Sequence, residues 1–197
     1  MPIIEAHLLE GYGDEAKSRL GRALTDAVTQ VIPASPEAIT VLIHEVAPSA
    51  YMRRGESRSP ASARPDPVAM VRDFLAAMEA RDLERARGFL APGFTMHFPA
   101  AAPMRTLEEL IAWAKPRYRF VKKTYEGFDV ATSGEAVVVY ARGMLSGEWP
   151  DGTAFADIRF IDRFEIEAGR FTRQEVWNDI AETQAQESAA QEKGPHA

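Results

Sequence analysis

A proline in second position is the residue of this sequence with the most distinctive chemistry. If Met1 is removed, Pro2 becomes an N-terminal secondary amine. A free α-amino group titrates near ~7.7–8.0, and burial in an apolar pocket lowers that pKa because it disfavours the charged form. A base poised near neutrality suits proton transfer next to a carbonyl group. The simpler alternative is that Pro2 only stands at the end of an edge strand.

An aspartate inside an apolar stripe is the second chemical signal. On a predicted strand, Asp162 shares one face with four apolar residues, namely Ile158, Phe160, Phe164 and Ile166. A carboxyl group at such a position needs a raised pKa or a partner, and either marks a candidate site. In the alternative interpretation Asp162 is structural and pairs with a nearby arginine.

Metal and nucleic-acid sites are not expected. His7 and His44 fall on predicted strands of one sheet without HxH or HExxH spacing, so we interpret them as structural histidines. Five basic residues lie between Lys115 and Lys123, but a single-strand binding groove would need more aromatic residues, so we expect a solvated connection. Proton transfer by itself requires neither a metal ion nor an organic cofactor, and none is implied.

Length and composition set outer bounds on function. The chain has 197 residues, 46% hydrophobic and 26% charged, which allows one large domain or two small ones. Its net charge is −6 and neither predicted domain is basic overall, which argues against duplex nucleic acid as a partner. The absence of cysteine excludes disulfides, thiolate ligands and a cysteine nucleophile. No apolar run approaches the roughly 20 residues of a membrane-spanning helix, and no signal peptide is recognisable. We therefore expect a cytoplasmic protein without membrane contact.

The elements that must position Pro2 form a βαβ unit. Residues 3–9 alternate as a half-covered strand, residues 14–31 carry one apolar stripe of a helix with Asp14 as its N-cap, and residues 39–45 are a second strand. Such strands run parallel with a right-handed crossover. A unit of this size leaves two sheet edges and one sheet face open, so we expect it to associate with other copies.

A second domain must position Asp162. Three prolines and three serines in the region 57–67 indicate a semi-extended linker. Beyond it, helical patterns precede a short strand at 94–98, a capping box at Thr106 and Glu109 starts another helix, and four strand-like runs follow near 124–132, 136–147, 153–167 and 170–178. This order predicts α+β architecture, with helices on one face of a curved antiparallel sheet. The predicted organisation is a first domain over 1–56, a linker over 57–66, a second domain over 67–180 and a fraying polar tail over 181–197.

The first domain resembles the 4-oxalocrotonate tautomerase family. Four segments carry the resemblance: Pro2-Ile3-Ile4, Leu9-Glu10-Gly11, Asp14-Glu15-x-Lys17 and Ile43-His44-Glu45-Val46. The resemblance implies loss of Met1, a paired dimer of βαβ units and commonly a hexamer. It also implies that Pro2 is the general base in keto–enol tautomerisation of a small oxo-acid, or in a related dehalogenation or hydration.

Substrate-binding positions depart in part from that family. Its tautomerases place arginines directly after the Leu-Glu-Gly turn and early in the second strand, where this chain has Tyr12 and Thr40. Tyr51 falls where the resemblance implies an aromatic pocket wall. Arg53 and Arg54 are the remaining candidates to clamp a carboxylate, since the guanidinium fork matches its shape. Alternatively, the two arginines form a solvated turn before the linker.

The second domain resembles the SnoaL-like branch of the nuclear-transport-factor-2-like superfamily. The run from Asp162 to Phe171 and the closing Val176-Trp177-Asn178-Asp179 carry the resemblance. It implies a conical fold around an apolar pocket, in a superfamily of isomerases, cyclases, hydrolases and non-enzymes. His97, Tyr140, Asp157 and Trp177 are candidates to reach the same cavity as Asp162, where an acid and a base could move a proton. The alternative is a cone filled by its own side chains.

The fold class expected is therefore α/β plus α+β, with a βαβ tautomerase-like unit followed by a conical domain. The leading functional hypothesis is an isomerase in which Pro2 is catalytic and Tyr51, Arg53, Arg54 and Tyr12 position a carbonyl or carboxylate substrate. Its expected partners are that small molecule and further copies of the chain in a dimer, trimer or hexamer. Two alternatives stay open: a non-enzymatic oligomeric binding protein, and an enzyme whose chemistry lies in the cone.

Overall fold

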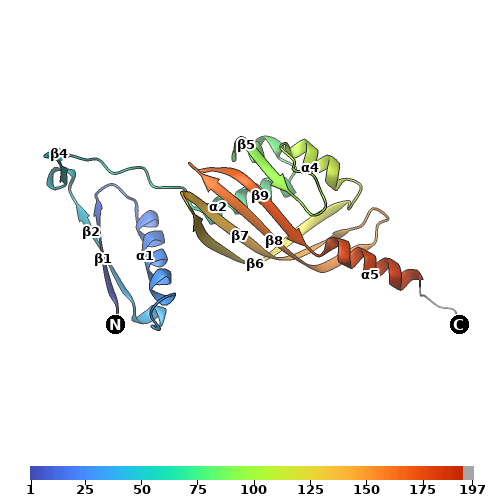
Figure 1. Cartoon of the computed structure of the whole chain (residues 1–197), viewed down its shortest axis with the longest axis horizontal. Helices are drawn as coiled ribbons and strands as arrows, with labels where there is room; N and C mark the ends of the chain where they lie inside the picture. Colours follow the sequence, from blue (N-terminus) through green and yellow to red (C-terminus); the bar gives the residue numbers. More distant parts are fainter. Residues whose placement is uncertain (193–197) are drawn as a thin grey trace. The chain divides into compact units, whose positions relative to one another are not determined.

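A computed structural model describes residues 1–192 and divides the chain into two compact units, Met1–Arg64 and a second that begins at Pro65 (Figure 1). Each unit is described by itself. Within residues 1–192, every helix is too short or too polar to cross a membrane.

The first unit is the expected βαβ motif. Strand β1 (Ile3–Leu9) runs parallel to β2 (Thr40–Val46), and helix α1 (Asp14–Thr29) connects them (Figure 1). The register places Ile3 opposite Thr40 and His7 opposite His44. Asp14 is the first residue of α1 rather than its N-cap, a position that Gly13 occupies without a side-chain hydrogen bond. An acidic residue there still favours the helix, because it faces the positive end of the helix dipole.

Short elements complete this unit. The single-turn helices η1 (Pro36–Ala38) and η2 (Pro48–Ala50) flank β2. Strands β3 (Met52–Arg53) and β4 (Glu56–Ser57) then form an antiparallel hairpin. Its turn has positive φ at both Arg54 and Gly55, as in the type I′ turns that match the twist of a hairpin.

The second unit packs three helices against a five-stranded sheet. The helices are α2 (Pro67–Glu79), α3 (Leu83–Arg87) and α4 (Leu107–Ala114). The strands are β5 (Leu90–His97), β6 (Phe120–Ser133), β7 (Ala136–Glu148), β8 (Ala154–Glu167) and β9 (Arg170–Asn178). They are ordered β5-β9-β8-β7-β6, and β6 to β9 form the expected antiparallel meander.

The sheet is mixed rather than wholly antiparallel, which corrects the expectation. Strand β5 pairs in parallel with β9, with Met96 opposite Gln174 and His97 opposite Glu175. The long connection through α4 makes this possible, since it separates β5 from the meander and lets β5 join the far edge. Pairing of this kind depends on contacts between distant segments, which a local pattern does not contain.

Side-chain caps mark the start of each of these three helices. Asp66 accepts hydrogen bonds from Val68 and Ala69 at the start of α2, and Asp82 accepts one from Arg85 at the start of α3. Thr106 and Glu109 form the predicted capping box of α4. These bonds satisfy backbone N–H groups that have no partner inside the helix, and so fix where each helix starts.

Aromatic side chains from helix and sheet form the core between these layers. Phe74 of α2 lies 5.8 Å from Phe164 of β8 and 5.2 Å from Phe171 of β9, measured between ring centroids and with the rings edge to face. A smaller cluster includes Trp149 and Phe155, whose ring centroids are 4.3 Å apart. Aromatic pairs in such arrangements add to the free energy of burial.

The expected fraying tail is instead a helix over much of its length. Helix α5 (Ile180–Glu192) follows β9, and the indole N–H of Trp149 donates a hydrogen bond of 2.7 Å to Glu187. Ile180 packs against the smaller cluster. The remainder of the predicted tail, residues 193–197, lies outside the described residues.

Candidate functional site

Pro2 lies just before β1, where a hydrogen bond holds its backbone and the residue in front of it is exposed. The backbone N–H of Thr40 donates a hydrogen bond of 3.1 Å to the carbonyl of Pro2. Pro2 is half-buried, whereas Met1 is 92% exposed. Removal of Met1 would therefore expose the Pro2 nitrogen without breaking the contact that anchors the strand.

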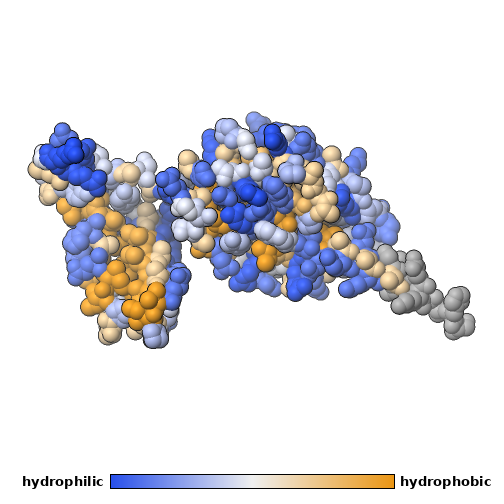
Figure 2. Space-filling view, viewed as in Figure 1, coloured by the Kyte–Doolittle hydropathy of each residue, from blue (hydrophilic) through white to orange (hydrophobic). Residues whose placement is uncertain are grey.

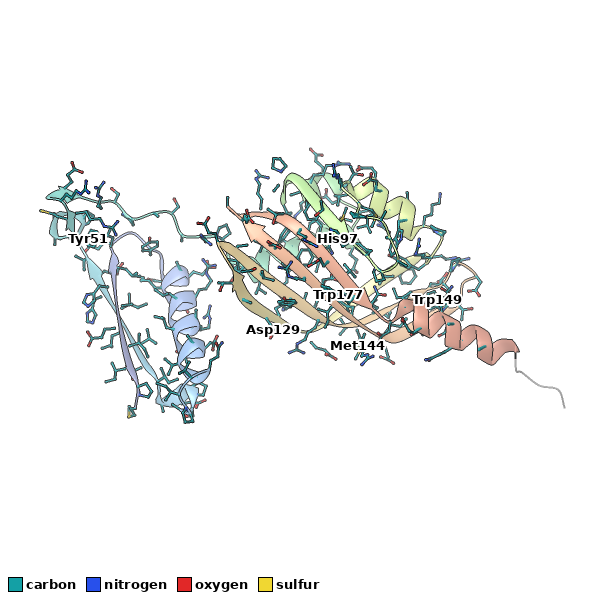
Figure 3. All side chains as sticks on the ribbon, in the orientation of Figure 1. Tyr51, His97, Asp129, Met144, Trp149 and Trp177 are labelled. Atoms are coloured by element: carbon teal, nitrogen blue, oxygen red, sulfur yellow. The ribbon has the colours of Figure 1, made fainter. Side chains whose placement is uncertain are left out.

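The predicted substrate-binding residues lie at the opposite end of the strands. Tyr12 follows the carboxyl end of β1, and Tyr51, Arg53 and Arg54 follow the carboxyl end of β2. Arg53 donates a hydrogen bond of 3.4 Å to the Tyr51 hydroxyl group. Figure 1 marks the N-terminus at one end of β1 and β2, and Figure 3 labels Tyr51 beyond the other.

One copy of the chain therefore does not bring Pro2 together with these side chains. Strand β1 has seven residues, which span roughly 23 Å at ~3.3 Å per residue. An arginine side chain reaches only a fraction of that length. Any site that combines Pro2 with Arg53 needs two copies of the chain.

The first unit leaves apolar side chains exposed on one face of its sheet. None of its residues 1–64, all of which the structure describes, is buried. Ile3 is 62% exposed and Leu42 is 42% exposed on the sheet face away from α1. We call this the open face, formed by Ile3, Glu5, His7, Leu42 and His44. Figure 2 shows apolar side chains reaching the surface of this unit.

The two histidines of the open face contact one another. The rings of His7 and His44 stack with centroids 4.8 Å apart, and His44 Nε2 lies 3.8 Å from a carboxylate oxygen of Glu5. Possible metal-ligating atoms of these three exposed residues lie within 4.8 Å of one another. The structural role of the two histidines stays a prediction, and this cluster lies on the sheet face away from α1.

In the second unit, the structure places one of the five predicted cavity residues on the inner face of the sheet. Asp162 is fully buried among the apolar residues of β8. Tyr140 and Trp177 alternate with inward-facing residues and so lie on the outer face, where Trp177 is 51% exposed (Figure 3). His97 pairs with Glu175 on that same outer side, and Asp157 is exposed at an irregularity of β8 with φ of +59°.

The partner of Asp162 is a lysine rather than the arginine that the alternative interpretation named. The ammonium group of Lys123, on β6, forms an ion pair and a hydrogen bond with Oδ2 of Asp162. Burial raises the pKa of the Asp162 carboxyl group above its ordinary range, and the nearby Lys123 opposes that shift. Lys123 Nζ also lies 4.6 Å from the centre of the Phe160 ring.

A cavity of about 450 Å³ lies between α2, α4 and the inner face of the sheet, and Lys123 lines it. Gln174 of β9 also lines it, as do Tyr118 and Tyr125. Burial raises the pKa of the Tyr118 hydroxyl group, and burial together with the negative charge of Asp162 raises that of Tyr125 to about 12. Both hydroxyl groups therefore stay protonated and able to donate near neutral pH.

Sequence reasoning missed these polar residues, although one signal was present. Lys123 shares one face of β6 with Val121 and Tyr125, while Lys122 and Thr124 lie on the other, which is the pattern of a strand with one covered face. The basic run from Lys115 drew attention to charge and hid that alternation. For Gln174 no comparable signal exists, because a single amide side chain on a strand is uninformative without the fold.

Comparison with known families identifies both units. Residues 2–59 match the family model described as tautomerase enzyme, and residues 71–174 match the one described as SnoaL-like domain. The second match covers more than half of the chain.

Individual proteins resemble each part. A probable tautomerase of Staphylococcus aureus (strain Mu50 / ATCC 700699) is 41% identical over 59 residues, which cover 30% of this chain and 97% of the relative. A probable tautomerase of Streptococcus thermophilus (strain CNRZ 1066) is 36% identical over 58 residues, or 29% of this chain and 95% of the relative. A solved NTF2-like protein of unknown function from Burkholderia pseudomallei is 22% identical, with a TM-score of 0.49, covering 60% of this chain and 94% of its own. The chain thus belongs to the SnoaL-like family through its second unit and joins to it a tautomerase-family domain, homologous to bacterial probable tautomerases.

Proposed function

We propose that the chain is an isomerase that catalyses keto–enol tautomerisation, or related proton-transfer chemistry, of a small oxo-acid. Pro2 is the general base of this reaction once Met1 has been removed. The observation that carries the proposal is the position of Pro2 within a tautomerase-family domain: its carbonyl is anchored to Thr40, while the residue in front of it is exposed. A secondary amine at that point can accept a proton from carbon next to a carbonyl group.

A second copy supplies the carboxylate clamp in this proposal. The amino end of the sheet has no cation of its own, because the only charged residues between 26 and 42 are Asp26 and Glu37. Arg53 and Arg54 lie at the far end of the same strands, beyond the reach of Pro2. A carboxylate held beside Pro2 would therefore be paired with an arginine from a neighbouring chain, in a homo-oligomer.

The hairpin after β2 suits that role. Arg53 is already oriented by its hydrogen bond to Tyr51, and the turn at Arg54 and Gly55 projects from the unit on a short, well-defined hairpin. The guanidinium fork can hold a carboxylate by two hydrogen bonds, and the Tyr51 ring can form an apolar wall beside it. Tyr12, which stands where the resembling tautomerases have an arginine, makes this clamp depend more heavily on Arg53 and Arg54.

The test begins with the chain's own N-terminus. The proposal requires loss of Met1, because Pro2 is acylated and has no basic nitrogen while Met1 is present. Mass spectrometry of the intact protein is expected to show this loss. Conversion of phenylenolpyruvate to its keto form, followed by ultraviolet absorbance, is then expected to fall by about 10²-fold or more in Pro2→Ala, as for loss of a general base. Pro33→Ala, which lies in an exposed loop, is the matched control. Retained Met1, or equal rates in Pro2→Ala and the unmodified chain, would contradict the proposal.

A further inference from the structure

The cavity of the second unit combines an apolar wall with a small group of polar atoms. Most of its lining is apolar, from α2, α4 and the inner face of the sheet. A volume of about 450 Å³ is typical of pockets that enclose a small organic molecule. The polar atoms that line the cavity determine which chemical groups such a molecule must carry.

Lys123 is the central polar residue of the cavity. Its side chain extends from β6 across β7 towards Asp162 on β8, with which it is paired. Lys123 lines the cavity and Asp162 does not, so the lysine lies between the cavity and the carboxylate. An ammonium group has three N–H donors, and the bond to Asp162 uses only one of them.

Other polar groups around Lys123 have no hydrogen-bond partner among the described residues. The Oε1 atom of Gln174, itself 2% exposed, has no hydrogen-bond partner among the described residues. The hydroxyl groups of Tyr118 and Tyr125 remain protonated and form no hydrogen bond to another described residue. A buried polar atom without a partner, as Gln174 Oε1 is, costs free energy that a suitable ligand would recover.

The charges around the cavity favour a negatively charged ligand. Arg81, Arg119, Lys122 and Lys123 line it together with a single acidic residue, Glu79. Arg119 is ion-paired with Glu148 and Lys123 with Asp162, so the unpaired positive charge among the described lining residues is that of Arg81 and Lys122. Asp162 stands behind Lys123, and its Oδ2 atom is paired with the ammonium group. A neutral apolar molecule would fill the volume but leave the ammonium and hydroxyl donors unpaired, whereas a carboxylate accepts from all of them.

We propose that this cavity is a binding site for a small organic anion with a flat apolar body, an aromatic or conjugated carboxylate, whose carboxylate group is held by Lys123. The rings of Phe74 and Phe98 and the aliphatic wall of α4 contact its body, and the Tyr118 and Tyr125 hydroxyl groups complete the set of donors. Gln174 accepts from a hydroxyl group where the ligand has one. This site is independent of Pro2, so it stands whether or not the first unit is a tautomerase.

The test compares a carboxylate with its neutral amide in the full-length chain. By isothermal titration calorimetry, 2-naphthoate is expected to bind at least tenfold more tightly than 2-naphthamide. In Lys123→Met/Asp162→Asn, which removes both charges, the preference for the carboxylate should disappear through loss of 2-naphthoate affinity. Lys123→Arg should keep the preference, and Lys115→Met, a matched change outside the cavity lining, should leave it unchanged.

Three results would overturn the proposal. They are equal binding of the two compounds by the unmodified chain, no saturable binding of 2-naphthoate, and a 2-naphthoate affinity that survives Lys123→Met/Asp162→Asn. The first two need no variant, so a variant that fails to fold leaves the proposal testable. Pro2→Ala should bind 2-naphthoate normally, which separates failure here from failure of the proposed tautomerase chemistry.

Discussion

Lys123 and Asp162 form an ion pair that spans three strands of the second unit, from β6 across β7 to β8. The aspartate is fully buried, while the lysine side chain retains 21% of its exposure and lines the cavity. The pair therefore ties the inner face of the sheet together and at the same time presents a positive charge to whatever enters the cone.

Removal of the lysine alone should destabilise the second unit. Lys123→Met leaves the Asp162 carboxylate buried without a partner, a change that costs about 3–5 kcal/mol in comparable buried pairs. The free energy of unfolding can be measured by urea denaturation with tryptophan fluorescence. All three tryptophans lie in the second unit, so the signal reports on that unit alone.

The same variant should also respond to pH in a defined direction. Burial already raises the pKa of Asp162, and without Lys123 nothing opposes that shift. Between the ordinary carboxyl pKa of ~3.9 and the raised value, the unfolded chain loses its proton first, so stability falls as pH rises. Lys123→Met should therefore lose more stability relative to the unmodified chain at pH 8 than at pH 5. Adding Asp162→Asn should abolish this pH dependence, and a difference that is constant with pH would contradict the assignment.

The aromatic core provides a test of the fold itself. Phe164 is fully buried, with ring centroids 5.8 Å from Phe74 and 5.1 Å from Phe171. Phe164→Ala should lower the free energy of unfolding by about 3–5 kcal/mol, because it removes buried surface and leaves a cavity. Val130→Ala, at an exposed position of β6, should change it by less than about 0.5 kcal/mol. Similar losses in the two variants would show that the core is not built as described.

The Tyr125 hydroxyl group should release its proton only at high pH. Its pKa is raised to about 12, first by burial and then by the negative charge of Asp162. Ultraviolet absorbance of tyrosinate should therefore show a transition near pH 12 that Tyr125→Phe removes and Tyr51→Phe leaves in place. Because the unfolded chain releases this proton near pH 10 and the folded chain does not, stability should fall as pH rises from about 10 to 12. Tyr125→Phe should weaken that fall, and an unchanged profile would place the hydroxyl group in solvent.

Much of the fold follows from local signals in the sequence. The capping box at Thr106 and Glu109 marks the start of α4, and the alternation around Asp162 identifies the buried face of β8. Both depend on residues close together in the chain. The parallel pairing of β5 with β9 depends instead on which distant edge is free, and no local pattern contains that information.

The residues of the candidate sites were likewise predictable only where a local pattern in the sequence reveals them. Asp162 is visible because it interrupts an apolar stripe, whereas its partner Lys123 lies 39 residues away and two strands over. Trp177 and Tyr140 were expected to reach the cavity, but chemistry alone does not say on which side of a strand a residue falls. In the first unit, the topology of two parallel strands separates Pro2 from Arg53, which explains why a single chain does not assemble the proposed site.

The open face of the first unit should be an interface between copies. Leu42→Glu introduces a charge beside Ile3 and the stacked histidines, and burial of an unpaired charge is costly. Light scattering should show a smaller assembly for Leu42→Glu than for the unmodified chain. Ala23→Glu adds the same charge at an exposed position of α1 and should leave the mass unchanged. An unchanged mass in Leu42→Glu would mean that copies associate elsewhere.

Two inactive variants should restore activity when they are mixed. Pro2→Ala lacks the base, and Arg53→Ala/Arg54→Ala lacks the clamp, so each alone should lose about 10²-fold or more in rate. If Pro2 of one copy works with the arginines of another, random oligomers refolded from an equal mixture contain about one intact site in four. If Pro2 and the arginines had to come from the same chain, every site would carry one of the two defects. Recovery of about a quarter of the activity would support a shared site, and a mixture as inactive as its components would contradict it.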